Sequence, residues 1–141
     1  MNPIPDRELG LLYARALVAI ARADHAIEVE EGEVLAQRIH ARCVIPLRIE
    51  DLLLEPPLTP EQFAELIENR DGPFRSAQVR PRELGAALVE DGIAIMLAKG
   101  HATETEADRL WRFAEALGLS SDEFRALTQA VAPWFPTTDT P

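Results

Sequence analysis

Apolar residues recur every three or four positions along most of the chain, which is the spacing of one face of an α-helix. The first such stretch, from Leu9 to Ala23, predicts a helix over about residues 6–24. The pattern predicts further helices over residues 28–43, 48–54, 60–69 and 81–99, another after Thr103, and a last one that begins after Ser120 and ends at Pro133. No segment alternates apolar and polar residues for long, so we expect no β-sheet.

Residues typical of helix ends stand at the boundaries of these segments. Thr59, Thr103 and Ser120 each precede a Gln or Glu by three positions. This is the spacing of a capping box, in which two side chains bind each other's free backbone N–H groups. Gly100 and Gly118 follow apolar stretches, where glycine commonly closes a helix.

Small residues are concentrated in the helix predicted over residues 81–99. Gly85, Ala86, Ala87 and Gly92 keep this helix thin and allow neighbouring helices to approach closely. A glycine in mid-helix costs roughly 1 kcal/mol relative to alanine. Gly92 therefore suggests a packing reason for its presence.

Composition and charge fit one folded domain. The 141 residues are 47% hydrophobic and 27% charged, and the net charge is −10. This acidic balance disfavours nucleic acid and anionic membrane surfaces as partners. The helix predicted over residues 6–24 is too short and too polar to span a bilayer. The lone Cys43 fits a reducing, cytoplasmic compartment, and we expect no signal peptide.

Two parts of the chain resemble each other when one is shifted by 75 positions. Glu31 then falls on Glu106 and Leu35 on Leu110, and the pairs Ala19/Ala94, Ile20/Ile95 and Ala23/Ala98 also coincide. Each part reads as a long Ala-rich helix, a tight turn and a second helix. We therefore predict one compact all-α domain over residues 1–141 with six to seven helices. Its two pseudo-symmetric halves span about residues 6–45 and 81–133. Residues 46–80 connect the halves, and residues 134–141 form a tail.

The turn of each half carries a recognisable motif. The first half reads Ala21-Arg22-Ala23-Asp24-His25-Ala26-Ile27, with Glu31 four residues further on; the second reads Ala98-Lys99-Gly100-His101, with Glu106 following and then Leu117-Gly118-Leu119-Ser120. From about Leu9 to Leu127 the chain resembles the TerB-like family, associated with tellurite resistance. His25 stands where the family favours Gly, and Lys99 where it favours Asp.

The resemblance implies a non-enzymatic protein of a bacterial stress response, tied to tellurite or metal ions, that binds a metal ion or a protein partner. On this basis Asp24, Glu28, Glu31 and Glu106 are the candidate ligands of a divalent cation, because hard cations prefer carboxylate oxygens. A capping role for Glu31 and Glu106 at the third helical position is the favoured alternative. Leu35 stands where an EF-hand would need its bidentate Glu.

Several other residues are candidates for chemistry or for partner binding. His25, His40 and His101 lack the spacing of a zinc site, and Cys43 has the apolar surroundings of a buried, inert thiol. Lys99 is a candidate to pair with Asp24, Glu28 or Glu31 in place of a cation. Trp134-Phe135 and the arginines Arg70, Arg75, Arg80 and Arg82 could serve a protein partner or self-association, although packing and solubility explain them more simply. We expect no enzyme; the alternatives are a metal-dependent enzyme that uses the acidic and His-bearing turns, and a structural homodimer without a ligand.

Overall fold

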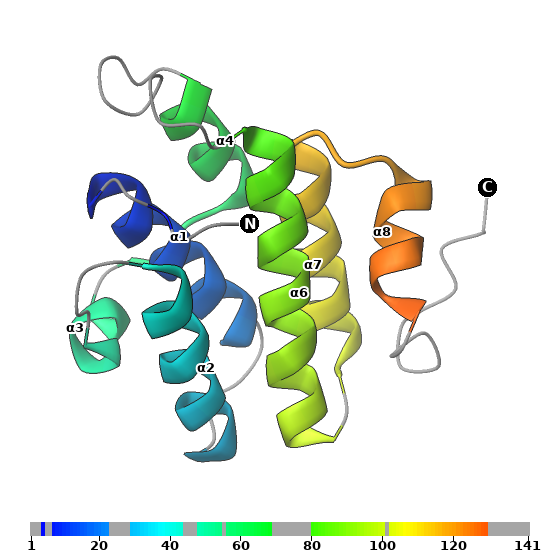
Figure 1. The fold of residues 1–141 in the computed structure, drawn as a ribbon. Helices are drawn as coiled ribbons and strands as arrows, with labels where there is room; N and C mark the ends of the chain where they lie inside the picture. Colours follow the sequence, from blue (N-terminus) through cyan, green and yellow to red (C-terminus); the bar gives the residue numbers. More distant parts are fainter. Residues whose placement is uncertain are drawn as a thin grey trace.

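The computed structural model describes residue 4 and residues 7–22, 29–43, 48–54, 56–68, 80–100 and 102–129. These residues form seven α-helices and no strand, which confirms the all-helical class (Figure 1). The helices, labelled as in Figure 1, are α1 (Arg7–Ala21), α2 (Val29–Arg42), α3 (Ile49–Leu53), α4 (Pro60–Glu68), α6 (Pro81–Lys99), α7 (Glu104–Ala116) and α8 (Ser121–Leu127). None of these described helices is both long and apolar enough to cross a membrane.

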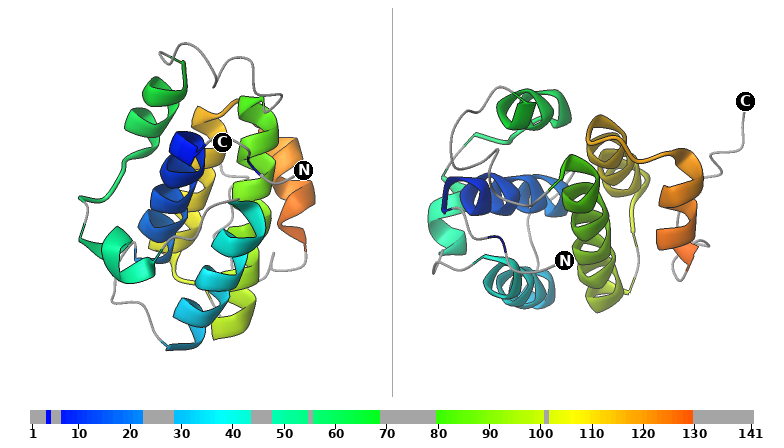
Figure 2. Two further views of the ribbon diagram at one scale, coloured as in Figure 1. Left: turned by 60° about the vertical axis from the view of Figure 1, so that its left-hand side comes forward. Right: turned by 45° about the horizontal axis from the view of Figure 1, so that its top comes forward.

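Helix α1 lies at the centre of the bundle and contacts α2, α3, α4, α6 and α7. Figure 2 shows it between α4 and α2, with α3 across its outer side. Eleven of its fifteen residues are buried, and most of these are small or aliphatic. Burial on nearly all sides follows from its run of alanines, which lets several helices approach one axis.

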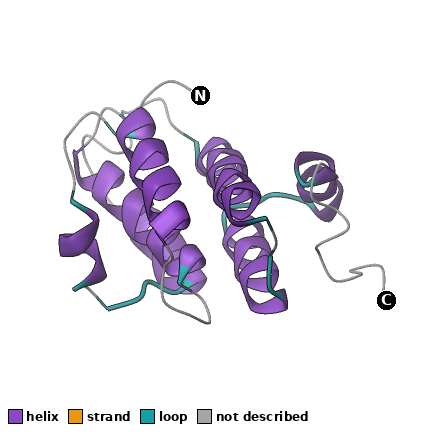
Figure 3. Ribbon diagram, turned by 90° about the horizontal axis from the view of Figure 1, so that it is seen from below, coloured by secondary structure: helices purple, strands orange, loops and turns teal. Residues whose placement is uncertain are grey.

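Helix α6 is the second central element, and glycines set how closely its neighbours approach. A Cβ atom on Gly92 would stand 2.9 Å from Cδ1 of Leu110 in α7, and one on Gly85 would stand 2.6 Å from Cδ1 of Leu119. The close packing expected at Gly92 is therefore confirmed. Seen from below in Figure 3, α8 stands apart from α1–α4 and packs against α6 and α7.

The capping boxes form as the sequence predicts. Thr103 Oγ1 accepts from the N–H of Glu106 at 3.1 Å, and Glu106 Oε1 accepts from the N–H of Thr103 at 2.9 Å. The same reciprocal pairs form at the starts of α4 and α8. Gly100 and Gly118 close α6 and α7 with φ of 88° and 96°, the left-handed conformation that favours glycine.

Two helix ends differ from the prediction. Helix α1 ends at Ala21, three residues earlier than expected, and α8 ends at Leu127 rather than at Pro133. At the end of α8 the hydroxyl of Thr128 donates to the carbonyl of Phe124 at 2.9 Å, so the side chain takes an acceptor of the last turn. Residues 130–141, which include the predicted end of α8, lie outside the described part.

The two helix pairs that the 75-residue shift relates, α1 with α2 and α6 with α7, pack against each other. The helices of each pair are in contact, α2 also packs on α6 and α7 on α1, and the two long helices α1 and α6 meet. Leu35 and Leu110, which the shift superimposes, are both fully buried. This arrangement suits a pseudo-two-fold relation, whereas the duplication itself stays a prediction.

Candidate functional site

The two glutamates predicted as cation ligands lie inside the molecule at the beginnings of two helices. Glu31 and Glu106 are the third residues of α2 and α7, and neither is more than 1% exposed. Both helices begin at the same end of the bundle (Figure 1). The capping role is confirmed for Glu106, which binds the N–H of Thr103. The corresponding position before α2 is outside the described residues.

The rest of the predicted cation site is only partly described. Asp24 and Glu28 lie outside the described residues, as do His25, His101 and the side chain of Lys99, so the predicted pairing of Lys99 stays a prediction. Within the described ranges no group of three or more His, Cys, Asp or Glu side chains is arranged to hold a metal ion. The candidate partner residues Arg70, Arg75, Trp134 and Phe135 also fall outside them, whereas Arg82 forms an ion pair with Glu123 of α8.

The strongest polar cluster of the described residues surrounds Asp91, at the middle of α6. Asp91 is fully buried and accepts from Tyr13 of α1 and from two arginines of α2. Arg38 Nε donates to Oδ1 at 2.6 Å, while Arg42 donates through Nε to Oδ2 at 3.0 Å and through Nη2 to Oδ1 at 3.2 Å. Arg42 Nη2 also reaches Glu90 Oε2 at 3.1 Å. We call Tyr13, Arg38, Arg42 and Asp91 the Asp91 cluster.

The Asp91 cluster joins α1, α2 and α6, and its mutual hydrogen bonds leave its side chains with little chemical reactivity. Its carboxylate accepts several charge-assisted hydrogen bonds, which offset the cost of burying a charge. Burial, and then the charge and hydrogen bond of Asp91, raise the pKa of Tyr13 well above its usual value, so the phenol stays a neutral donor. The side chain of Arg38 is 35% exposed and that of Arg42 only 11%, so the cluster opens to solvent through Arg38.

Sequence reasoning missed the Asp91 cluster, although one signal for it was present. Asp91 lies three residues after Leu88 and four before Ile95, on the apolar face of its helix. An acid at such a position must be paired when it is buried. The 75-residue shift places Ala16 opposite Asp91, and Phe113 and Leu117 opposite the two arginines, so the cluster has no counterpart in the other half.

Cys43 follows α2 and has the buried, inert environment that the sequence predicts. It is 5% exposed, and its Sγ donates to the carbonyl oxygen of Gly10 at 3.4 Å. Burial and the charge of Asp91 raise its pKa from 9.0 to about 11. The thiol is therefore protonated at neutral pH and is a poor nucleophile. The backbone pairs with Ile4 in an isolated parallel bridge.

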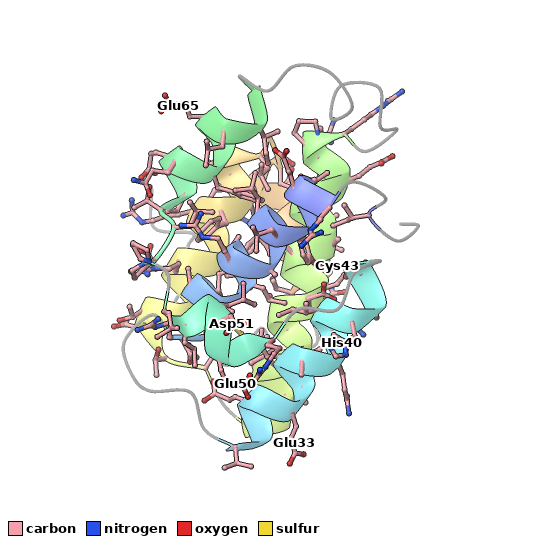
Figure 4. The ribbon with its side chains drawn as sticks, turned by 90° about the vertical axis from the view of Figure 1, so that its left-hand side faces the viewer. Glu33, His40, Cys43, Glu50, Asp51 and Glu65 are labelled. Carbon is pink, nitrogen blue, oxygen red and sulfur yellow. The ribbon has the colours of Figure 1, made fainter. Side chains whose placement is uncertain are left out.

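A small pocket lies where α1 meets the segment from α3 to Pro57. Its walls combine the side chains of two arginines with apolar ones: Arg15, Val18, Ala19, Arg22, Leu52, Pro56 and Pro57. Arg15 Nη2 donates to the carbonyl of Pro56 at 3.3 Å, and Arg22 Nη1 to that of Leu53 at 3.2 Å. Figure 4 looks onto this side of the molecule, where α3 with Glu50 and Asp51 lies over α1.

Three exposed leucines are close in the sequence to residues that line this pocket. Leu54 is 84% exposed and Leu53 37%, directly after the buried Leu52. Leu11 is 40% exposed and precedes Arg15 by one turn of α1, so it lies on the same stripe of the helix. We call the pocket together with Leu11, Leu53 and Leu54 the α1–α3 face. Sequence reasoning missed it because α3 and α1 are brought together only by the fold.

Comparisons of the chain with protein-family models, with curated proteins and with solved structures gave no match. The resemblance to the TerB-like family therefore rests on the sequence motifs alone, and it stays a prediction.

Proposed function

We propose that the chain is a non-enzymatic module that binds a protein partner through the α1–α3 face. The observation that carries the proposal is the 84% exposure of Leu54 beside a pocket that contains two arginines. A single exposed leucine is ordinary on a protein surface. Here Leu11 and Leu53 are exposed as well, and the pocket is lined by arginine, which is enriched at protein interfaces.

The test uses two exposed leucines at different places on the molecule. Leu54→Asp changes the α1–α3 face, whereas Leu97→Asp changes a 52% exposed leucine near the end of α6. Proximity labelling in the host cell would compare the proteins labelled by each variant with those labelled by the wild type. We expect Leu54→Asp to lose a defined set of partners that Leu97→Asp keeps. Identical partner sets for all three proteins, with equal circular dichroism, would contradict the proposal.

A second candidate function is a cation-linked role in the response to tellurite or metal ions. It is favoured by the burial of two acids, Glu31 and Glu106, at helix starts that share one end of the bundle. Calorimetric titration with Mg²⁺, Ca²⁺, Mn²⁺ and Zn²⁺ tests it directly. Heat should be lost in Glu31→Gln and kept in Glu65→Gln, whose residue is exposed on α4. No heat with any of these ions in the wild type excludes the cation role and leaves the partner-binding proposal untouched.

The proposal also has a cellular side. We place the module in the reducing cytoplasm, because its lone thiol is buried and unavailable for a disulfide. If the response is to tellurite, cells that lack the protein should grow more slowly than wild-type cells when tellurite is added. Equal growth at every tellurite concentration would remove that link.

A further inference from the structure

Arg15 of α1 and Arg22, which directly follows α1, are about two helical turns apart, and both line the same pocket. The rise of an α-helix separates their Cα atoms by about 10 Å along the axis. Each arginine has five N–H donors, and each donates to one main-chain carbonyl of the neighbouring segment. Both side chains therefore keep most of their donors for another partner.

The positive charge of these two arginines is not balanced locally. No carboxylate of the described residues lies within ion-pair distance of either guanidinium group, in a chain whose net charge is −10. Within the same ranges Arg15 Nε is buried and has no hydrogen-bond acceptor. A buried donor without an acceptor is unfavourable, so this nitrogen favours an acceptor oxygen that can reach it. The pocket therefore has the charge and the unused donor of an anion site.

Neither Glu50 nor Asp51, the described acids of α3, lines this pocket. Glu50 of α3 lies 3.7 Å from Arg48, which is its ion-pair partner. Asp51 is exposed on the same short helix. Both acids repel a negatively charged ligand from α3. Such a ligand is therefore expected to lie along Arg15 and Arg22.

The pocket and the leucines define the ligand further. The pocket has room for about one water-sized group, which suits a single carboxylate oxygen and excludes a ring. In a polyproline II peptide, which advances about 3.1 Å per residue with three residues per turn, side chains three residues apart lie on the same side and about 9 Å apart. This matches the separation of Arg15 and Arg22, and the exposed Leu54 offers a contact for an apolar side chain of the same peptide.

We propose that the α1–α3 face binds an extended acidic peptide segment of a protein partner, with two carboxylates three residues apart that pair with Arg15 and Arg22. An apolar side chain of the peptide packs on Leu54. This inference rests on the proposed partner-binding function and names the chemistry of the partner.

The experiment uses fluorescence anisotropy with the full chain and a labelled peptide that carries two glutamates three positions apart and a leucine between them. A second peptide has both glutamates replaced by glutamine. We expect the glutamate peptide to bind and Arg15→Gln or Arg22→Gln to weaken it by about tenfold or more, because each removes charge-assisted hydrogen bonds. Added salt should weaken binding as well.

Matched variants separate a local effect from a general one. Arg112→Gln removes a positive charge from α7, where Arg112 pairs with Asp108, and it should leave binding unchanged. Arg15→Lys keeps the charge and the packing against Pro56 but loses the planar fork, so it should bind between the wild type and Arg15→Gln. Circular dichroism shows whether each variant is folded.

The outcomes distinguish this proposal from the more general one. Equal binding of the glutamate and glutamine peptides, or unchanged binding in both arginine variants, overturns the acidic-peptide proposal. No binding of the glutamate peptide to folded wild type at millimolar concentration overturns it too. In either case the partner-binding function still stands if Leu54→Asp loses partners in the cell, and it falls separately if that variant does not.

Discussion

Arg42 and Asp91 join α2 to α6 through two hydrogen bonds, from Nε to Oδ2 at 3.0 Å and from Nη2 to Oδ1 at 3.2 Å. Asp91 is fully buried, and the side chain of Arg42 is 11% exposed. A buried ion pair of this kind contributes little net stability relative to apolar residues of the same size. Removal of one partner is costly, because it leaves the other charge buried and uncompensated.

We predict that Asp91→Asn lowers the free energy of unfolding by about 3–5 kcal/mol, because two arginines lose their carboxylate. Urea denaturation followed by circular dichroism measures the change. Asp108→Asn is the matched control, since Asp108 forms an exposed i,i+4 pair with Arg112. The control should unfold at nearly the wild-type urea concentration. Similar midpoints for both variants would show that the Asp91 cluster does not hold the helices together.

Tyr13→Phe tests the phenol of the same cluster without changing the ring. The buried carboxylate loses one donor, and a hydrogen bond to a charged group is worth about 1.5–3 kcal/mol. We expect a loss of stability in that range at neutral pH by urea denaturation. The pKa of Tyr13 is raised in the folded state, so its contribution is present below the unfolded pKa of about 10 and is lost as the pH rises beyond it. Tyr13 is the only tyrosine, so tyrosinate absorbance should appear together with alkaline unfolding and not before it.

Cys43 makes the protein sensitive to alkaline pH through its own ionisation. Its pKa is raised from 9.0 to about 11, so the unfolded chain releases this proton first and stability falls as the pH rises from 9 to 11. The loss approaches about 3 kcal/mol, because each pKa unit corresponds to about 1.4 kcal/mol. Urea denaturation at a series of pH values measures it. In Cys43→Ala the curve should be flatter over this interval; an unchanged pH dependence would assign the alkaline loss to other groups.

Gly92→Ala should destabilise the protein although alanine favours the helix. The new methyl group would stand 2.9 Å from Cδ1 of Leu110, which is fully buried and has little room to move. Overpacking of this kind costs about 1–3 kcal/mol. In a Leu110→Ala background the same substitution should be neutral or stabilising, because the clash is gone. Thermal unfolding of the four proteins tests this; equal effects of Gly92→Ala in both backgrounds would exclude the contact as the cause.

The helix boundaries could be predicted from the sequence because caps are local. Thr103 and Glu106 are three residues apart, so their reciprocal hydrogen bonds can be predicted from the sequence alone. The predicted end of α8 at Pro133 is wrong, because the helix ends at Leu127, after which the N–H and the hydroxyl of Thr128 both donate to the carbonyl of Phe124.

The sites could be predicted less well, because their contacts join distant positions. Asp91 meets Tyr13 across 78 positions, and Arg15 meets Pro56 across 41. The pattern indicated that Asp91 lies on an apolar face, but it did not identify the donors. It placed Arg15 and Arg22 on one helix without indicating that α3 would form a pocket over them. For Glu31 and Glu106, the sequence predicts the position at the third helical residue, but it does not predict that both side chains are buried.

The lack of symmetry in the Asp91 cluster bears on mispairing of helices. If α7 took the place of α2 against α6, Phe113 and Leu117 would stand where the arginines belong, and Asp91 would be buried without a counter-charge. That penalty of several kcal/mol disfavours the wrong arrangement of two similar helix pairs. It does not disfavour an exchange of α2 between two identical chains, since each would still supply arginines to the other's Asp91. The cluster thus disfavours incorrect packing of the helices within one chain, but it is compatible with a domain-swapped dimer.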